Sequence, residues 1–203
     1  MPLHEGPGSP WLCAVLVAVL PLARPQAAGA QSAPLVLEVH GGAAVPTGAF
    51  SHGSATGEGT SAGVSYGVDL ALSGLGRRAL YVGFGQHRFP CADAGCAAGE
   101  RYVATGFDAG LRFRLRMRGA VQPWVRVGVV TTRVEMPVLP TAPAGTSKLG
   151  VGGEGGFGVL IGAASSVAIS PGLRYTAVNT TLPGGGTLRM RYVLVDLTLV
   201  LEF

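Results

Sequence analysis

The chain has 203 residues, of which 48% are hydrophobic, only 13% are charged and 33 are glycine. Soluble domains usually carry about 25% charged residues, and average glycine usage is about 7%, so this composition disfavours an ordinary helical enzyme. The high apolar content together with a net charge of +4 excludes intrinsic disorder. The length fits one folded domain of roughly 170 residues behind a removable N-terminal segment.

Residues 1–30 are predicted to be a signal peptide that is not part of the fold. The apolar run at residues 11–22 is too short for a membrane helix, which needs about 20 residues, and Ala28-Gly29-Ala30 fits an A-x-A cleavage site. The residues before Trp11 contain no Lys or Arg, which leaves the true start codon open. We expect the folded domain to cover residues 31–203.

The expected mature chain contains two cysteines, Cys91 and Cys96. Two nearby cysteines in an exported protein most simply form a disulfide that closes a loop. A metal site would need further ligands, and the segment between them offers only Asp93. We therefore predict a disulfide and expect neither a metal ion nor a cofactor.

From Leu35 onward, apolar residues recur at every second position, which is the period of a strand with one apolar face. The clearest run covers residues 103–117, where Arg112, Arg114 and Arg116 alternate with apolar residues. On a helix these arginines would spread around the axis and leave no apolar stripe. The pattern predicts eight strands, near residues 35–39, 64–72, 80–89, 103–117, 125–129, 151–161, 167–178 and 193–203.

The connections between these strands alternate between long and short. The gaps near residues 46–61, 90–100, 135–150 and 179–188 are long, and those near 73–78, 118–120 and 163–166 are short. This alternation is typical of a transmembrane barrel with short periplasmic turns and longer outer loops. The charge-free stretch 155–173 is long enough for a membrane helix, but its Gly, Ser and Pro residues favour a hairpin.

We therefore predict an all-β fold, an eight-stranded antiparallel up-and-down transmembrane β-barrel with both termini in the periplasm. The apolar face would contact lipid, because closure removes the open edges that lipid cannot satisfy. The opposite face carries charges of both signs, which predicts a network of ion pairs that plugs a narrow lumen. Its expected members are Glu38, Asp69, Asp108, Arg112, Arg114, Arg126, Glu154, Arg174 and Asp196. Interior glycines are expected to make room for the arginines: Gly106, Gly110, Gly128, Gly152, Gly156 and Gly158.

The closing segment, residues 192–203, alternates apolar and polar residues and ends in Phe203. It resembles the C-terminal strand of bacterial outer-membrane barrels, and residues 42–51 and 122–128 resemble small OmpA/OmpX-like barrel domains. The resemblance covers residues 35–203 and implies a Gram-negative outer membrane, with outer-membrane lipid around the barrel. In that family the barrel-assembly machinery recognises the terminal strand. Carried over, this assembly signal comprises Tyr192, Val195, Leu197, Leu199, Leu201 and Phe203.

Several motifs suggest chemistry but have simpler explanations. Residues 63–67 match G-x-S-x-G and residues 150–155 match G-x-G-x-x-G, yet both lie within predicted strands instead of the strand-to-helix turns that these motifs need. The alternation of the basic run 112–118 aims its arginines into the barrel or its periplasmic mouth, so we expect no nucleic-acid partner. His52 lies beside Ser51 and Ser54 in the first long loop, where solvated loop residues are the favoured interpretation.

Three functional classes stay open. The favoured one is a barrel with a charged, plugged lumen and a structural or surface-interaction role through its extracellular loops, because all recognisable chemistry is architectural. The alternatives are a narrow channel for small solutes and an outer-membrane lipid hydrolase at the rim, using His52 and a neighbouring serine. A soluble lipocalin-type barrel is a weaker fourth option. We expect a monomer without enzymatic activity; the sequence does not specify an extracellular partner.

Overall fold

The structure is a computed structural model that describes residues 34–52, 59–75, 77–92, 99–115, 120–137, 144–162 and 166–203. The predicted signal peptide lies outside the described residues, and so does Cys96. The signal peptide and the disulfide with Cys91 therefore stay predictions. No helix in the described part of the chain is both long and apolar enough to cross a membrane.

Eight long strands make up the fold, and two short elements lie in the connections between them. The long strands are β1 (Leu35–Pro46), β2 (Gly63–Leu75), β3 (Arg78–Pro90), β4 (Arg101–Arg114), β5 (Val121–Met136), β7 (Gly150–Ile161), β8 (Val167–Thr181) and β9 (Thr187–Glu202). The short elements are helix α1 (Ala49–His52) and strand β6 (Gly145–Thr146), which pairs with the end of β5.

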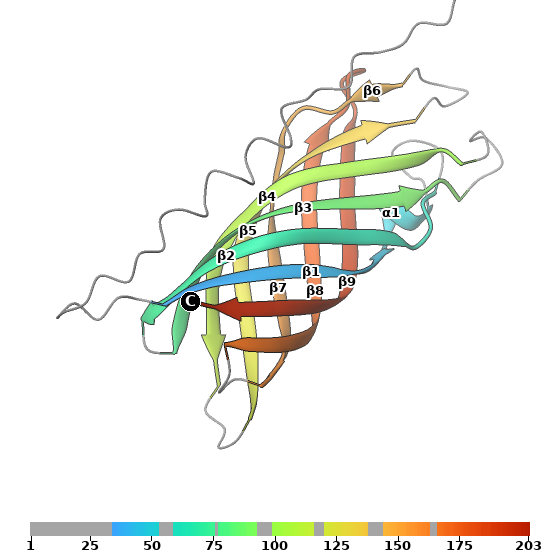
Figure 1. The fold of residues 1–203 in the computed structure, drawn as a ribbon. Helices are drawn as coiled ribbons and strands as arrows, with labels where there is room; N and C mark the ends of the chain where they lie inside the picture. The colour runs from blue at the N-terminus through green and yellow to red at the C-terminus, as the bar shows by residue number, and fades with distance from the viewer. Residues whose placement is uncertain are drawn as a thin grey trace, which may run out of the picture. The chain divides into compact units, whose positions relative to one another are not determined.

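The long strands are hydrogen-bonded in the order β4-β3-β2-β1-β9-β8-β7-β5, and the pairing of β5 with β4 closes the sheet (Figure 1). Every pairing is antiparallel. The first and last strands meet along a seam that runs from Val36 opposite Glu202 to Pro46 opposite Tyr192. The predicted eight-stranded antiparallel barrel is confirmed, and closure leaves none of its long strands with an open edge.

Successive residues of each strand face alternately outward and into the lumen, as the pleat requires. In β9, Val195, Leu197 and Leu199 are exposed, whereas Asp196 and Thr198 between them are buried. The same alternation holds in β5, where Val125, Val127 and Val129 are exposed and Arg126 is buried. The outer surface is thus apolar and the charged side chains point inward, as the sequence pattern predicted. This arrangement suits a lipid surrounding.

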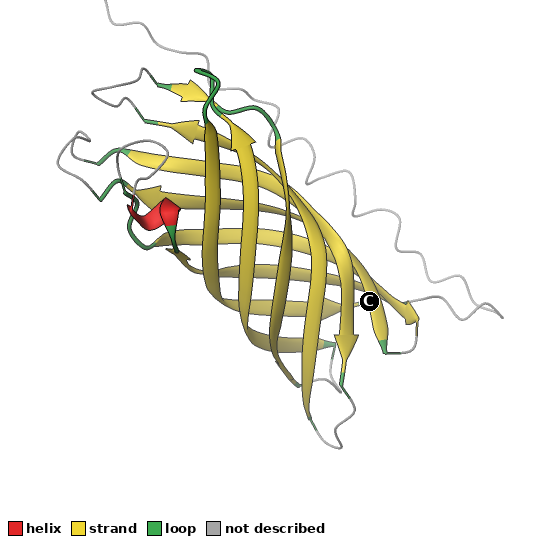
Figure 2. Cartoon of the chain, turned by 180° about the vertical axis from the view of Figure 1, so that it is seen from behind, coloured by secondary structure: helices red, strands yellow, loops and turns green. Residues whose placement is uncertain are grey.

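The two ends of the barrel differ (Figure 2). At one end, here called the long-loop end, lie α1, β6 and residues 182–186; at the other, the short-turn end, lie Pro34, Phe203 and the short hairpin turns. The connection between β8 and β9 is shorter than the predicted gap at residues 179–188, because β8 continues to Thr181 and β9 begins at Thr187. Its tight turn is closed by the Leu182 N–H donating to the Gly186 carbonyl, with Gly185 at a φ of 89°.

Candidate functional site in the barrel lumen

The side chains inside the barrel form three layers. Near the short-turn end is an apolar group, the short-turn cluster: Val36, Ala71, Ala79, Tyr81, Trp124, Leu160, Ala168 and Val200. Towards the long-loop end is a second group, the long-loop cluster: Ala44, Phe50, Phe89, Tyr102, Ala104, Val134, Leu188, Met190, Tyr192 and Leu194. The ion-pair layer joins the charged residues: Glu38, Asp69, Asp108, Arg112, Arg126, Glu154, Arg174 and Asp196.

Arg126 is the centre of the ion-pair layer. Its Nη1 lies 3.0 Å from Asp69 Oδ2, and its Nη2 lies 2.5 Å from both Asp108 Oδ2 and Glu154 Oε1. The side chain of Arg126 is only 2% exposed. Three carboxylates from three other strands therefore converge on one guanidinium, which can donate five hydrogen bonds.

Two further arginines each have one carboxylate partner. Arg112 of β4 contacts both oxygens of Glu38 from β1, with Nη2 at 2.5 Å from Oε2. Arg174 of β8 contacts Asp196 on the adjacent strand β9. Together with Arg126, three arginines face five carboxylates in this layer, so the carboxylates are in excess.

Arg114 was also predicted to join the network, but its place is different. It is the last residue of β4, half-buried at the short-turn end. Among the described residues it forms no ion pair. The alternation of β4 predicts the inward direction of Arg114 correctly. Its position at the end of the strand, however, separates Arg114 from the carboxylates of the ion-pair layer.

Two aromatic residues that the sequence analysis did not single out support the arginines. The Tyr81 hydroxyl donates a 2.7 Å hydrogen bond to Glu154, and its ring centre lies 3.9 Å from Cζ of Arg126. Trp124 donates a 2.8 Å hydrogen bond from Nε1 to Ser170, and its ring lies 5.1 Å from Cζ of Arg112. These cation–π contacts hold the guanidiniums in place where water is excluded.

The prediction that interior glycines make room for arginines was wrong for most of them. A side chain at Gly128 would collide with the Tyr81 hydroxyl, and one at Gly158 would collide with the Trp124 ring. Of the six glycines named, only Gly156 faces an arginine, Arg174. The space left by these glycines is taken more by the rings of Tyr81 and Trp124 than by guanidinium groups.

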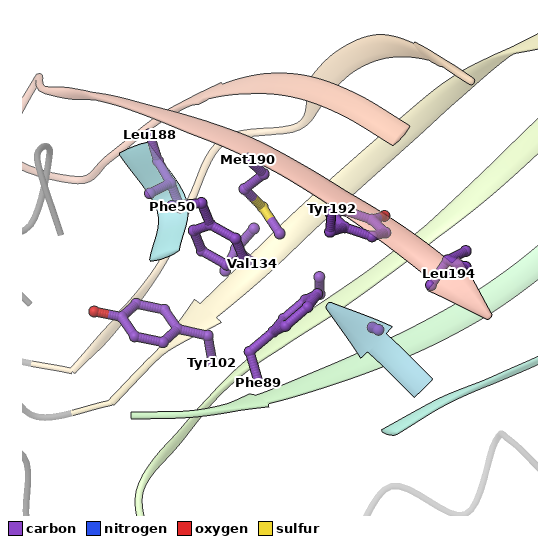
Figure 3. Close-up of a cluster of buried hydrophobic side chains, with 10 residues drawn as sticks. Phe50, Phe89, Tyr102, Val134, Leu188, Met190, Tyr192 and Leu194 are labelled. Atoms are coloured by element: carbon purple, nitrogen blue, oxygen red, sulfur yellow. The ribbon is translucent and has the colours of Figure 1, made fainter. Parts of the chain in front are cut away.

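The long-loop cluster is built around Phe50, which α1 places in the barrel mouth (Figure 3). The Phe50 ring lies 5.0 Å from Phe89 in an edge-on contact and 6.2 Å from Tyr102. A 2.7 Å hydrogen bond from the Thr60 hydroxyl to the Phe50 carbonyl holds this segment. The sequence predicted a solvated loop here, so this apolar layer was missed.

Strand β9 supplies a large part of the long-loop cluster. Leu188, Met190, Tyr192 and Leu194 all face the lumen. Tyr192 thus lies on the opposite face from the other members of the predicted assembly signal, which face outward or end the strand. Over this stretch the apolar residues face inward and Arg189 and Arg191 face outward, the reverse of the pattern in residues 195–201, so the apolar face of the rest of β9 does not predict it.

A cavity of about 20 Å³ lies between the ion-pair layer and the long-loop cluster. Its walls include His40, His87, Glu154, Arg174, Thr176 and Tyr192. A volume of this size, counted as the space open to the centre of a water molecule, holds about one water. The polar walls suit a bound water and are too tight for a substrate.

The motif residues are buried in the barrel wall or hydrogen-bonded locally. Ser65 of the G-x-S-x-G motif lies in mid-strand and is 1% exposed, and its hydroxyl lies 2.8 Å from Nδ1 of His87. Ser51 donates its hydroxyl proton to the Gly48 carbonyl. Ser54 and the side chain of His52 lie outside the described residues. Within the described ranges, no group of three or more His, Cys, Asp or Glu residues is arranged to hold a metal ion.

The closed antiparallel sheet, the apolar exterior and the ionic interior define the class of an eight-stranded membrane β-barrel. In sequence, no protein-family model matches the chain, and no curated protein matches it either. The fold, however, is shared with several solved structures.

Neisserial surface protein A (NspA) superposes with a TM-score of 0.66 at 12% sequence identity, over 83% of this chain and 97% of that one. The outer membrane protein OprG from Pseudomonas aeruginosa gives a TM-score of 0.50 at 10% identity, over 81% and 95% of the two chains. The outer membrane protein AlkL, determined in DMPC lipid bilayers, gives 0.50 at 14% identity, over 89% and 94%. The chain therefore has the fold of small outer-membrane β-barrels.

Proposed function

We propose that this chain is an integral outer-membrane barrel with a structural or surface-interaction role and a lumen that does not conduct solutes. In this proposal the termini lie in the periplasm, and the long-loop end faces the outside and meets an extracellular partner. The barrel-assembly machinery is its partner during biogenesis, and outer-membrane lipid surrounds it afterwards.

The packing of buried side chains in the lumen supports this proposal. A solute would have to pass the short-turn cluster, the ion-pair layer and the long-loop cluster in turn. The rings of Trp124 and Tyr192 are buried within two of these layers, and a cavity between the ion-pair layer and the long-loop cluster has a volume of about 20 Å³. An eight-stranded barrel has just enough interior space for its own side chains.

The packing of the lumen also argues against the channel, and the contacts of the serines argue against a hydrolase. A channel for small solutes needs a continuous wet path, which apolar layers at both ends of the lumen oppose. A rim hydrolase would use His52 and a neighbouring serine, but Ser51 donates its hydroxyl proton to the Gly48 carbonyl. A hydrolase also needs room for a substrate beside its nucleophile, and Ser65 is 1% exposed in the barrel wall, with the half-buried His87 beside it. We accordingly propose no enzymatic role and no cofactor.

Planar-bilayer conductance tests the closed lumen. Protein refolded in detergent is first checked for a strand-dominated circular dichroism spectrum and for a mobility shift between folded and heat-unfolded forms. Inserted into the bilayer, this preparation should give no current steps above those of detergent alone. Regular steps from the folded wild-type barrel would refute the proposal and favour the channel.

Epitope insertion tests the orientation. A short tag inserted at Gly184, in the turn between β8 and β9, should be detected by antibody on intact cells. The same tag inserted at Arg77, in the turn between β2 and β3, should become accessible only after the outer membrane is permeabilised. The reverse pattern would place the long-loop end in the periplasm.

A further inference from the structure

The apolar outer surface ends abruptly on strands β3, β4 and β5 as they approach the long-loop end. Phe84 and Phe107 face outward there, with ring centres 5.2 Å apart, and Phe107 is 61% exposed. The next outward positions towards the long-loop end are Gln86 on β3 and Thr105 on β4, which are opposite each other in the register. Aromatic rings followed by polar side chains are typical of a membrane–water boundary.

Three exposed arginines from these neighbouring strands lie around one point of this boundary. Arg88 of β3 is opposite Val103 of β4, and Arg101 is two residues before Val103 on the same face. Arg133 of β5 is opposite Thr105, the next outward residue after Val103. Since adjacent strands are about 4.8 Å apart, the three long side chains can reach a common ligand.

Arg88 is held in a fixed arrangement. Its Nε and Nη2 donate hydrogen bonds of 3.1 and 3.0 Å to Oε1 of Gln86, which also accepts a hydrogen bond from Tyr66. Gln86 in turn donates a 3.2 Å hydrogen bond to Thr105. The guanidinium carbon lies 5.5 Å from the centre of the Tyr66 ring. This network orders the arginine before any ligand binds, which lowers the entropic cost of binding.

The positive charge of the three arginines is not matched by acidic neighbours. Within the described part of the chain, none of them is in an ion pair, because the ion pairs lie in the lumen. One carboxylate, Glu135, shares their face, opposite Val103. Three cations against one anion leave this patch with a positive surplus at the edge of an apolar surface.

We propose that Arg88, Arg101 and Arg133 form a binding site for the phosphate group of a lipid headgroup in the leaflet at the long-loop end, with the acyl chains lying on Phe84 and Phe107. Guanidinium forks match the geometry of phosphate oxygens. The exposed rings directly below the arginines favour an amphiphile over a free phosphate ion. This site rests on the proposed membrane location of the barrel, but not on whether its lumen conducts.

Phosphatidic acid is a suitable probe because its headgroup is a bare phosphate. Barrel refolded in a zwitterionic detergent is titrated with phosphatidic acid, and bound lipids are counted by native mass spectrometry. The double variant Arg88→Gln with Arg133→Gln should weaken binding by about 25-fold, since each basic residue near an anionic lipid surface contributes about fivefold. Phosphatidylcholine should bind no better to the wild type than to the variant.

A matched control uses two outward arginines of β9. Arg189→Gln with Arg191→Gln removes the same charge at the long-loop end, but on a strand that pairs with β1 and β8, away from the site. Because β9 is three strands away from both β3 and β5, a lipid at the site is screened from these charges, and the affinity should change by less than about twofold. Heat-modifiable mobility confirms that both variants fold.

Two outcomes would overturn the proposal. Equal weakening by both double variants would mean a general attraction of anionic lipid to basic residues, without a site. Binding of soluble glycerol 3-phosphate as tight as that of phosphatidic acid would mean that the acyl contact contributes nothing. Current steps in the bilayer experiment would refute the closed lumen but leave this result unaffected.

Discussion

Replacing Arg126 with Met tests whether the ion-pair layer holds the barrel together. Met keeps an unbranched apolar side chain but removes the guanidinium that contacts Asp69, Asp108 and Glu154. These carboxylates are 1%, 11% and 4% exposed, so bulk water cannot replace the lost partner. Leaving a buried charge without its partner costs about 3–5 kcal/mol. We expect the free energy of unfolding to fall by this amount.

Urea unfolding in lipid vesicles measures the effect, with tryptophan fluorescence and heat-modifiable mobility as two readouts. Trp124 is the only tryptophan after residue 30, and its burial in the lumen makes it a local probe. Arg189→Met, on the outer surface of β9 and away from the proposed lipid site, is the control and should cost less than about 0.5 kcal/mol.

A neutralised background separates charge from packing. With Asp69→Asn, Asp108→Asn and Glu154→Gln in place, Arg126→Met no longer leaves buried carboxylates without a partner. In this background the buried Arg126 cation has itself lost its three partners, so its removal should no longer lower the free energy of unfolding. An equal loss in both backgrounds would refute the electrostatic reasoning, as would a loss in the wild-type background no greater than that of the surface control.

Three further changes can be measured in the same way, and a fourth is followed in cells. Glu38→Gln removes the carboxylate partner of Arg112 and should lower the free energy of unfolding by about 3 kcal/mol. Asp108→Asn reduces the excess of carboxylates and should change it by less than about 1 kcal/mol; a loss as large as that of Glu38→Gln would contradict this. Phe50→Ala removes a ring from the long-loop cluster and should cost about 3 kcal/mol, and an unchanged urea midpoint would show that the ring is not packed there. Phe203→Ala should slow assembly in cells, measured as accumulation of unfolded chains, while leaving the urea midpoint of refolded protein unchanged; normal assembly would exclude Phe203 from the signal.

The strands and their faces could be predicted from the sequence because lipid imposes a strict pattern. An outward residue must be apolar and an inward charge must be paired, so residues 103–115 and 193–202 show an unbroken period of two. The set of charged lumen residues follows from the same alternation. Only Arg114 was placed in the network wrongly, because alternation gives the face of a residue but not its height in the barrel.

The pairings inside the lumen could not be predicted. Glu38 and Arg112 are 74 residues apart in the chain, and their contact across the lumen depends on how far each strand is shifted against the next. The long-loop cluster was missed for two other reasons. Leu188 and Met190 lie where the alternation of β9 is reversed, with arginines outside and apolar residues inside, and Phe50 lies in a polar segment whose burial depends on the shape of the barrel mouth.

The seam between β1 and β9 has a consequence for the order in which the interior forms. Strand β9 brings Tyr192 to the long-loop cluster, Asp196 to the ion-pair layer and Val200 to the short-turn cluster. Until this seam closes, these three side chains lie on an edge strand of the sheet, so none of the layers is fully enclosed. Pairings between such distant segments form slowly. We therefore expect the interior to exclude water in a single late step, when β1 and β9 pair.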